Sequence, residues 1–469
     1  MNLFLRPQTP RPGRLSHAWH FAWLFWLLPS LTTFASPPNV VIILADDLGY
    51  ADLGCYGNRF NETPRIDRLA AEGLRWTQFY AGPVCSPTRA NLQSGQEQAR
   101  FGITQHIPGH RRPFARLIDP PVQRQLPLEV TTIAESLAAT GYATGYFGKW
   151  HLGGPGYGPA EQGWQTTLVC QGNTQPPAVT GDRQRRTAEF LTAEAIRFIE
   201  SHREQPFLLQ VSHFAVHIPL STTPRLLAKY RSKPAVEGYP SLPEYAGLLE
   251  ELDQSVGEIV DAIDRLGLGR QTLVWFISDN GGLVHDQAGN VYTSNAPLRG
   301  EKGTLFEGGI RVPAITRWTD TIAAGTTSDA LATTIDLHPT LRELAESPPP
   351  SVPTDGVSLA GTWADPPQPP ADRSLFWHLP HYHHSKPAGA IRRGDWKLIE
   401  WFEDDTAELF HIAHDMGETT DLAAQQPALT AELRTSLADW RRQVNAQMPV
   451  TNPDHDPLRA DELARPPRR

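Results

Sequence analysis

Two pairs of oxygen-bearing side chains lie far apart in the chain, each at the end of an apolar run. Asp46 and Asp47 end the first run, and Asp279 and Asn280 end the second. Carboxylate and amide oxygens without soft ligands suit Ca²⁺ or Mg²⁺ rather than zinc. Acidic residues are common at strand ends, however, so the pairs alone also fit an ordinary solvated loop.

The most specific pattern is Cys-Ser-Pro-Thr-Arg, from Cys85 to Arg89, followed by Leu92 and Ser94. A single cysteine near an arginine is usually structural, because reactive thiols are the minority that lie in electropositive, exposed surroundings. The wider context of the pattern therefore decides whether Cys85 takes part in chemistry.

That context resembles the sulfatase family over nearly the whole chain after its N-terminal segment. In this family the signature Cys-x-Pro-x-Arg marks a cysteine that is oxidised enzymatically to formylglycine (3-oxoalanine) before folding. The matching blocks are PNVVIILADDLGYADLGCYGN, GYFGKWHLG, VHIPL, ISDNGG, LRGEKGTLFEGGIRVPAI, GDWKLIE and ELFHIAHDMGETTDLA. After the signature the family commonly has Leu-x-Thr-Gly-Arg, whereas this chain has Leu-Gln-Ser-Gly-Gln from Leu92 to Gln96, in which serine keeps the hydroxyl.

The resemblance implies an alkaline-phosphatase-like α/β/α fold and hydrolysis of sulfate esters. It makes Cys85 the formylglycine precursor. It also implies a bound Ca²⁺, with Mg²⁺ as the alternative, whose ligands are Asp46, Asp47, residue 85, Asp279 and Asn280. The sulfate-binding and catalytic residues implied by the resemblance are Arg89, Lys149, His151, His217 and Lys302.

These residue types suit the implied chemistry. A sulfate monoester carries a negative charge that repels nucleophiles, so its site needs a cation and fixed donors directed at the sulfuryl oxygens. In the implied mechanism one hydroxyl of hydrated formylglycine attacks sulfur with help from Asp279, and His217 with Lys302 protonates the departing alcohol. His151 then takes a proton from the second hydroxyl, which expels sulfate and regenerates the aldehyde.

Taken singly, each cationic residue has a simpler explanation. A lone histidine is more often structural or exposed, and Lys302 would ordinarily be a solvated charge. Two local patterns favour a site instead. Lys149 and His151 follow a predicted strand, and Gly300 and Gly303 flank Lys302, which indicates a close backbone turn beside a ligand.

The run HLPHYHH, residues 378–384, is rich in imidazoles. Zinc is one interpretation, but the spacing matches no ligand pair on a helix, and tetrahedral sites need a closed ligand set. We expect a loop at the rim of the site in which His381, Tyr382 and His383 bind substrate; a loop without function is the alternative. The segment is similar to WH-x-PHY segments of carbohydrate sulfatases, which favours a sulfated saccharide as substrate.

Apolar runs predict the strands that position these groups. Residues 39–45 (NVVIILA) are typical of a strand buried on both faces of a mainly parallel sheet. Further strands are predicted at residues 142–147, 207–211 and 273–277, and helices at residues 64–74, 131–140, 187–201 and 245–266. This alternation predicts a doubly wound α/β sheet whose acidic loops lie at the carboxyl ends of strands, where open α/β sheets bind ligands.

The N-terminal segment, residues 1–35, is expected to be a signal peptide. It carries three arginines and no acid ahead of an apolar stretch that ends in small residues. An uncleaved membrane anchor is the alternative, although the stretch is short and interrupted compared with the roughly 20 apolar residues of a span. We therefore expect a secreted or periplasmic protein without stable membrane insertion.

The remainder is expected to divide into a catalytic domain at residues 36–362, a smaller α+β domain at residues 363–450 and a loose tail at residues 451–469. A proline-rich stretch marks the boundary. Beyond it, residues 390–401 and 407–411 predict a short antiparallel sheet, and residues 427–444 a terminal helix.

Charge and cysteine content limit the partners. Removing the three arginines of the N-terminal segment takes the formal net charge from −9 to −12, which argues against binding to nucleic acids or anionic membranes. Cys55 and Cys170 either pair or, more simply, remain free thiols. The expected partners are a sulfated small molecule or saccharide and, during maturation, a formylglycine-generating enzyme.

Two other functions fit the sequence. A phosphate or phosphonate ester hydrolase of the same superfamily could use the same metal and formylglycine. A catalytically inactive, sugar-binding relative is the second alternative, but the full set of polar residues from Cys85 to Lys302 argues against it.

Overall fold

The computed structural model describes residues 37–174, 186–286, 288–364, 367–370 and 372–464. The predicted signal peptide lies outside these residues, as does the end of the predicted tail. In the described part of the chain, no helix combines the length and the apolar character needed to cross a membrane.

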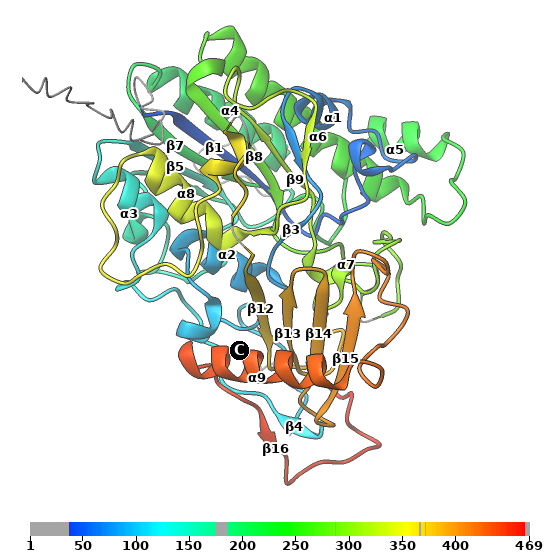
Figure 1. Cartoon of the computed structure of the whole chain (residues 1–469). Helices are drawn as coiled ribbons and strands as arrows, with labels where there is room; N and C mark the ends of the chain where they lie inside the picture. Colours follow the sequence, from blue (N-terminus) through cyan, green and yellow to red (C-terminus); the bar gives the residue numbers. More distant parts are fainter. Residues whose placement is uncertain (1–36, 175–185, 287, 365–366, 371, 465–469) are drawn as a thin grey trace, which may run out of the picture. The chain divides into compact units, whose positions relative to one another are not determined.

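The described residues form a central eight-stranded sheet in the order β10-β2-β9-β8-β1-β7-β5-β6 (Figure 1). Its strands are β1 (Asn39–Ala45), β2 (Leu74–Trp76), β5 (Ala143–Gly148), β6 (Thr166–Val169), β7 (Phe207–Ser212), β8 (Thr272–Ser278), β9 (Ala314–Arg317) and β10 (Thr326–Ser328). All neighbours are parallel except β9, which runs antiparallel to both β8 and β2. Every residue of β1, β7 and β8 is buried, as expected for strands covered on both faces.

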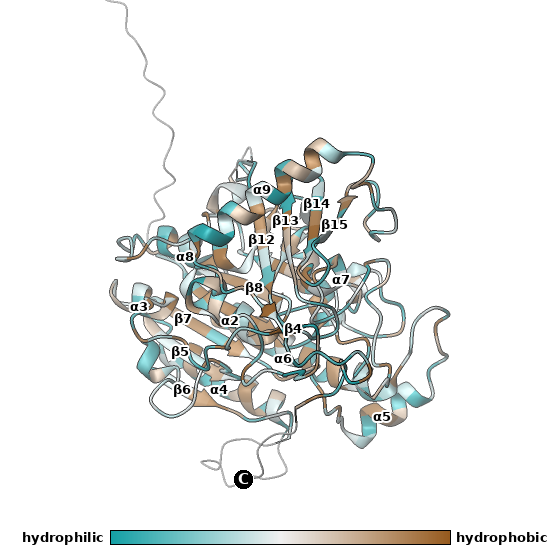
Figure 2. Ribbon diagram, turned by 90° about the horizontal axis from the view of Figure 1, so that it is seen from below, coloured by the Kyte–Doolittle hydropathy of each residue, from teal (hydrophilic) through white to brown (hydrophobic). Residues whose placement is uncertain are grey.

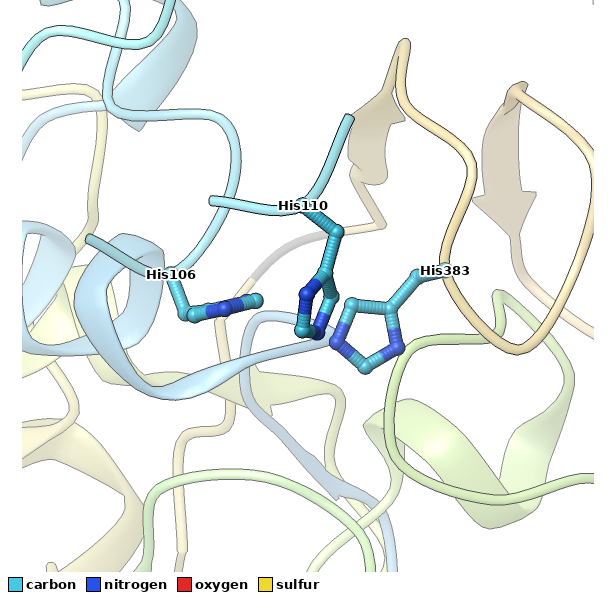
Figure 3. A group of neighbouring side chains, drawn as sticks. All are labelled: His106, His110 and His383. Carbon is cyan, nitrogen blue, oxygen red and sulfur yellow. The ribbon is translucent and has the colours of Figure 1, made fainter. Parts of the chain in front are cut away.

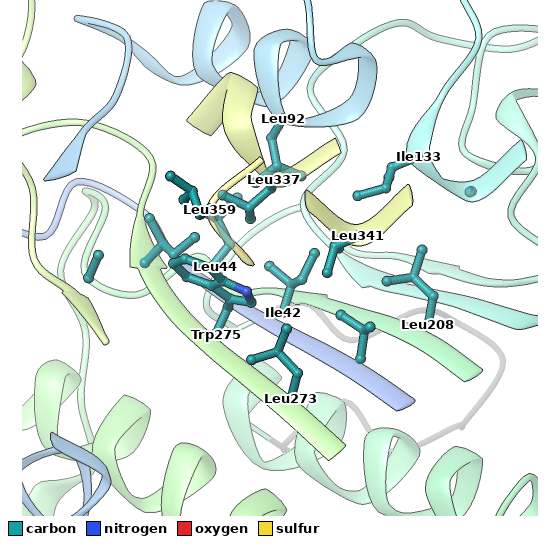
Figure 4. Packing of buried hydrophobic residues seen from close by; sticks show 14 of the residues in the cluster. Ile42, Leu44, Leu92, Ile133, Leu208, Leu273, Trp275, Leu337, Leu341 and Leu359 are labelled. Carbon is teal, nitrogen blue, oxygen red and sulfur yellow. The ribbon is translucent and has the colours of Figure 1, made fainter. Parts of the chain in front are cut away.

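Side chains of β1 alternate between two hydrophobic clusters, one on each face of the sheet. Ile42 and Leu44 pack in the cluster shown in Figure 4, together with Leu92, Ile133 and Leu341 from three helices. These helices are α2 (Cys85–Ser94), α3 (Ile133–Ala138) and α8 (Leu337–Leu344). Burial of each such side chain stabilises the fold by roughly 1.5–3 kcal/mol.

On the other face, Val41 and Ile43 pack against Ile66, Leu191 and Leu252. These residues belong to α1 (Pro64–Ala71), α4 (Thr187–Ser201) and α6 (Pro243–Arg265). Both α1 and α6 begin with proline, and α3 begins with a capping box formed by Thr132 and Glu135, so local signals define these helix starts. Helix α5 (Pro224–Arg231) lies beside α6.

A second, antiparallel sheet contains β12 (Ser374–Leu379), β13 (Ala388–Arg393), β14 (Trp396–Trp401) and β15 (Thr406–His411). One of its faces packs on α9 (Pro427–Gln443), and the other packs on α7 (Glu307–Ile310) and the residues before it. In Figure 2 both these strands and α9 show hydrophobic as well as hydrophilic colours. The smaller sheet is therefore covered on both sides, like the larger one.

Two short pairs complete the strands: β3 (Phe79–Tyr80) with β11 (Ala332–Thr333), and β4 (Leu117–Ile118) with β16 (Val450–Thr451). In the second pair, Val450 and Thr451 pair with Ile118 and Leu117. Asn452 adds hydrogen bonds to the carbonyls of Pro113 and Ala115, at 2.9 and 2.7 Å. The chain at residues 450–452 is thus held against residues 113–118 by strand pairing and by Asn452, while the loose tail at residues 451–469 stays a prediction.

The large, mainly parallel sheet and the small antiparallel sheet confirm the predicted α/β fold class. Strands β2, β6, β9 and β10 were not predicted, because each has only three or four residues, and the six-residue strand β12 was missed as well. Buried ion pairs join the small sheet to α7 and to the loop after β15: Lys397 of β14 lies 2.9 Å from both Glu307 and Glu418. The described residues from Pro37 onward form one compact unit, so the domain boundary at residues 362 and 363 stays a prediction.

Candidate active site

The candidate residues gather at the carboxyl ends of four neighbouring parallel strands. Strands β8, β1, β7 and β5 lie side by side and end at the same edge of the sheet. In β8 and β1, Ser278 pairs with Ala45, so the residues that follow them lie level. The loops after these strands carry Asp279 and Asn280 (β8), Asp46 and Asp47 (β1), His217 (β7), and Lys149 and His151 (β5).

Helix α2 brings Cys85 and Arg89 to this edge. Cys85 is its first residue, and every residue of the helix is buried. The Sγ atom of Cys85 lies 3.6 Å from Oδ1 of Asp46. Arg89, one turn further on, donates from Nη2 to Oδ2 of Asp279 at 2.7 Å and from Nη1 to the carbonyl of Lys149, also at 2.7 Å. Because a helix N-terminus favours negative charge, an anion beside residue 85 is stabilised by the helix as well.

Lys302 reaches the site from the loop between β8 and β9. Its backbone N–H donates to the carbonyl of Gly282 at 3.2 Å, and that of Gly303 donates to Pro83 at 2.7 Å. Its Nζ atom lies 2.7 Å from the carboxylate of Asp47. The loop is therefore anchored both to the segment after β8 and to the segment that leads into Cys85.

Buried carboxylates and cations balance one another in the site. Asp46 pairs with Lys149 and lies 3.7 Å from Nη2 of Arg89, while Nε2 of His217 lies 3.6 Å from Oδ2 of Asp47. Burial alone would raise the pKa of Asp46, but Lys149, His217 and Arg89 hold that pKa well below its ordinary value. Burial and the neighbouring Asp46 raise the pKa of Asp279 to about 7.

The four oxygen-bearing residues Asp46, Asp47, Asp279 and Asn280, the acidic site, fit a hard divalent cation. Oδ1 of Asn280 is buried and accepts no hydrogen bond from any described residue. Ligand atoms of Asp46, Asp47, Cys85 and His217 all lie within 4.8 Å of one another. Oxygen donors of this kind suit Ca²⁺ or Mg²⁺. His217 adds a nitrogen near the acids, a position that sequence reasoning assigned to proton transfer rather than to the metal.

The two candidate catalytic histidines differ in their surroundings. His151 has a left-handed backbone (φ 59°), and its Nε2 donates to the carbonyl of Ile107 at 2.7 Å. Its Nδ1 is buried and contacts no polar partner among the described residues, so that nitrogen is a free proton acceptor. Burial and Lys149 lower the pKa of His151 to about 3. Burial also lowers the pKa of His217, while Asp47 and Asp46 oppose that shift.

The predicted rim residues divide into buried and accessible ones. His381 is fully buried, with Nε2 2.8 Å from the hydroxyl of Thr104. Tyr382 is 5% exposed, accepts from the backbone of Leu117 at 3.1 Å and donates to Glu403. His383 is partly exposed. The structure thus gives His381 and Tyr382 partners inside the protein and leaves His383 as the accessible member.

Sequence reasoning missed the loop at residues 102–110. The hydroxyl of Ser86 donates to the carbonyl of His151 at 2.9 Å and accepts from the backbone N–H of Ile107 at 3.1 Å, so this loop packs on both the helix and the segment that carries His151. It carries His106 and His110. Neither histidine belongs to a recognisable motif, and only the tertiary structure brings them to the site.

The chain is similar to known proteins in both sequence and structure. A family model described as Sulfatase matches residues 38–347, and one described as N-sulphoglucosamine sulphohydrolase, C-terminal, matches residues 300–443. Arylsulfatase A of Homo sapiens is 36% identical over 449 residues, with 85% of this chain and 82% of that protein covered. N-acetylgalactosamine-6-sulfatase of Mus musculus is 32% identical, covering 80% of this chain and 74% of that protein. The crystal structure of Ps i-CgsB in complex with k-i-k-neocarrahexaose has a TM-score of 0.73 and 26% identity, covering 86% of this chain and 93% of that one.

Proposed function

Since the chain belongs to the sulfatase family and is a sulfuric ester hydrolase, we propose that it removes sulfate from a sulfated saccharide by means of formylglycine at residue 85 and a divalent cation. The observation that carries this proposal is the position of Cys85. It lies at the N-terminus of α2, 3.6 Å from Asp46, among three buried cationic side chains. A buried anion-binding pocket beside a modifiable residue is what the reaction requires.

When present, the formylglycine supplies a hydrated aldehyde as nucleophile, and the cation offsets negative charge on that nucleophile and on the sulfate. The acidic site would hold the cation, together with residue 85, and we propose Ca²⁺ as the ion, with Mg²⁺ as the alternative. The unpartnered Oδ1 of Asn280 supports this assignment.

The cationic side chains would orient the sulfate. Arg89, Lys149 and Lys302 are all less than 10% exposed, so their interactions with an anion are weakly screened. Each is already held by an acidic partner or a backbone carbonyl, which fixes it before substrate arrives. Such preorganised donors favour the charge that develops during transfer of the sulfuryl group.

The two histidines would move protons. His151 has its Nε2 occupied by Ile107 and its Nδ1 free, so Nδ1 is the atom that accepts a proton. His217 would donate from Nε2 to the departing alcohol, with Lys302 as the second candidate donor. Both Nε2 of His217 and Nζ of Lys302 lie beside Asp47, which supports a shared role.

A saccharide substrate is supported by the relatives and by the rim. N-acetylgalactosamine-6-sulfatase is named for a sugar sulfate, and Ps i-CgsB was solved with a carrahexaose. His383 is the rim residue that we propose to contact the sugar; His381 and Tyr382 would act by holding the loop in place. We also propose that the protein is secreted or periplasmic and that a formylglycine-generating enzyme converts Cys85.

Peptide mass spectrometry across residue 85, paired with activity assays, tests the proposal. The protein is produced with and without a formylglycine-generating enzyme and assayed on nitrophenyl sulfate, nitrophenyl phosphate and a panel of sulfated saccharides. We expect turnover in proportion to the fraction of 3-oxoalanine, and faster hydrolysis of sulfate than of phosphate. Full activity with an intact Cys85 thiol would overturn the mechanism, and faster phosphate hydrolysis would favour the phosphoesterase alternative.

A further inference from the structure

Three histidine side chains converge beside the site, from two loops far apart in the sequence. His106 and His110 lie on the loop before β4, and His383 lies between β12 and β13. Their rings point toward one another in Figure 3, and the ring centroids are separated by 4.4, 5.4 and 5.4 Å. A ring nitrogen from each lies within 4.8 Å of one from each of the others.

The backbone holds this three-histidine cluster in place. Next to His106, the carbonyl of Ile107 accepts a hydrogen bond from His151. A Cβ atom on Gly303 would lie 1.9 Å from Nδ1 of His383, so the ring packs directly on a backbone that glycine alone permits there (φ 78°). His384 then contacts the carbonyl of Lys302 through Nδ1 at 2.7 Å. The two loops are therefore fixed to the same elements as the catalytic residues.

We propose that the three-histidine cluster binds a transition-metal dication of the Zn²⁺ type at a site distinct from the acidic site. Three imidazole nitrogens suit Zn²⁺ and not Ca²⁺, which takes oxygen ligands. Zn–N bonds of about 2.0–2.1 Å in a tetrahedron place the nitrogens roughly 3.4 Å apart. Because the ring nitrogens already lie within 4.8 Å of one another, side-chain rotations that move each nitrogen by about 1 Å would bring them to this spacing. Three ligands leave the fourth position for water or an oxygen of a bound molecule.

The state of the imidazoles agrees with this geometry. Burial and the neighbouring His110 lower the pKa of His106 to about 2, and burial also lowers the pKa of His383 well below its ordinary value. Both rings are therefore neutral, the form that binds metal. Nδ1 of His106 is buried and receives no hydrogen bond within the described part of the chain. The ammonium group of Lys302 contributes to the lowered pKa of His106 and of His383, but it is already paired with Asp47, which offsets its repulsion of a second cation.

Titration of Zn²⁺ into the purified protein, in buffer that keeps Ca²⁺ saturating, tests the inference without reference to activity. Calorimetry measures stoichiometry and affinity, and Co²⁺ in place of Zn²⁺ reports tetrahedral nitrogen coordination by its absorption spectrum. The variants are His106→Ala, His110→Ala and His383→Ala. His202→Ala removes a histidine at the end of α4 and is the matched control. Circular dichroism and thermal melting check that each variant is folded.

We expect one Zn²⁺ per chain. Each cluster variant should lose Zn²⁺ affinity by at least roughly 100-fold, because loss of a residue that only hydrogen-bonds to a metal ligand already lowers affinity by up to about 100-fold. The affinity of His202→Ala should not change. Asp279→Asn alters the acidic site but keeps Asp47 as the partner of Lys302, so it should leave Zn²⁺ binding intact. Binding that disappears in Asp279→Asn and persists in the three histidine variants would place Zn²⁺ in the acidic site and overturn the inference. The absence of saturable binding, or unchanged affinity in folded His110→Ala and His383→Ala, would also overturn it. These outcomes are independent of whether the protein hydrolyses sulfate esters.

Discussion

The acidic site and the three-histidine cluster share Lys302 as a neighbour but are built in different ways. The ammonium of Lys302 pairs with Asp47, and its carbonyl contacts the residue after His383. Members of the acidic site follow buried parallel strands, and the charges of its three aspartates are almost fully buried. Members of the cluster lie on loops and are partly exposed, and burial lowers the pKa of each, which favours the neutral form. A site made of buried charges depends on its counter-ions for stability, whereas a site made of neutral rings does not.

The largest effect should come from the residue beside the acidic site. We expect Cys85→Ser, made in a host that oxidises only cysteine, to lower turnover by on the order of 10⁵-fold or more, as loss of a nucleophile does elsewhere. A serine hydroxyl can be sulfated once, but no second hydroxyl on the same carbon exists to expel the sulfate. Steady-state assays and a mass spectrum of the peptide after incubation with substrate measure both results.

Cys55→Ser is the matched control for that variant, because Cys55 lies on the far side of β1 from α2, near Asp67, and is not part of the site. It should retain turnover. Sustained multiple turnover by Cys85→Ser would contradict the formylglycine mechanism.

Removing the cation from the acidic site should abolish activity and lower stability. Three buried carboxylates then keep only the cationic and histidine side chains around them, and the binding free energy of the ion is lost. At a cation concentration 100 times its Kd, that contribution is about 2.7 kcal/mol. Thermal melting and activity assays before and after exhaustive chelation measure the change. Asp279→Ala should behave like the chelated protein, and added Ca²⁺ should change neither its activity nor its melting temperature. Full activity with an unchanged melting temperature would rule out this site.

A third, smaller effect separates the two candidate proton donors beside Asp47. His217→Ala should lower kcat roughly 10²- to 10⁴-fold on a sugar sulfate, whose alkoxide leaves poorly, and much less on nitrophenyl sulfate, whose phenoxide hardly needs a proton. Parallel kinetics on the two substrates measure the ratio. Equal losses of kcat on both substrates would assign the role of proton donor to Lys302 instead of His217.

The smallest effect should follow removal of Zn²⁺ from the three-histidine cluster. A chelator selective for Zn²⁺ over Ca²⁺ should lower the melting temperature less than removal of Ca²⁺ does, because neutral, partly exposed imidazoles exchange a metal for water without creating charge repulsion. Calorimetric melts of the same sample under both treatments provide the comparison. A larger drop after Zn²⁺ removal would reverse the contrast between the two sites.

Much of the acidic site could be predicted from the sequence, since its signals are local. A continuous apolar run such as residues 39–45 predicts a buried strand, and the acids after it must then lie at the edge of a sheet. Cys85 and Arg89 are one helical turn apart, so they share a face once α2 forms. The pairing of Ala45 with Ser278, which sets Asp46 beside Asp279, has no local signal and depends on the order of the strands.

The sequence by itself predicted the buried strands, most of the helices and a set of candidate residues that the structure brings together. Only the tertiary structure decided that His381 and Tyr382 are buried, that strands of three or four residues such as β2 and β9 extend the sheet, and that His106 and His110 meet His383. Periodicity and capping act over a few residues, so they specify elements. Contacts between loops 273 or more residues apart depend on how the whole core packs, and no short pattern encodes that packing.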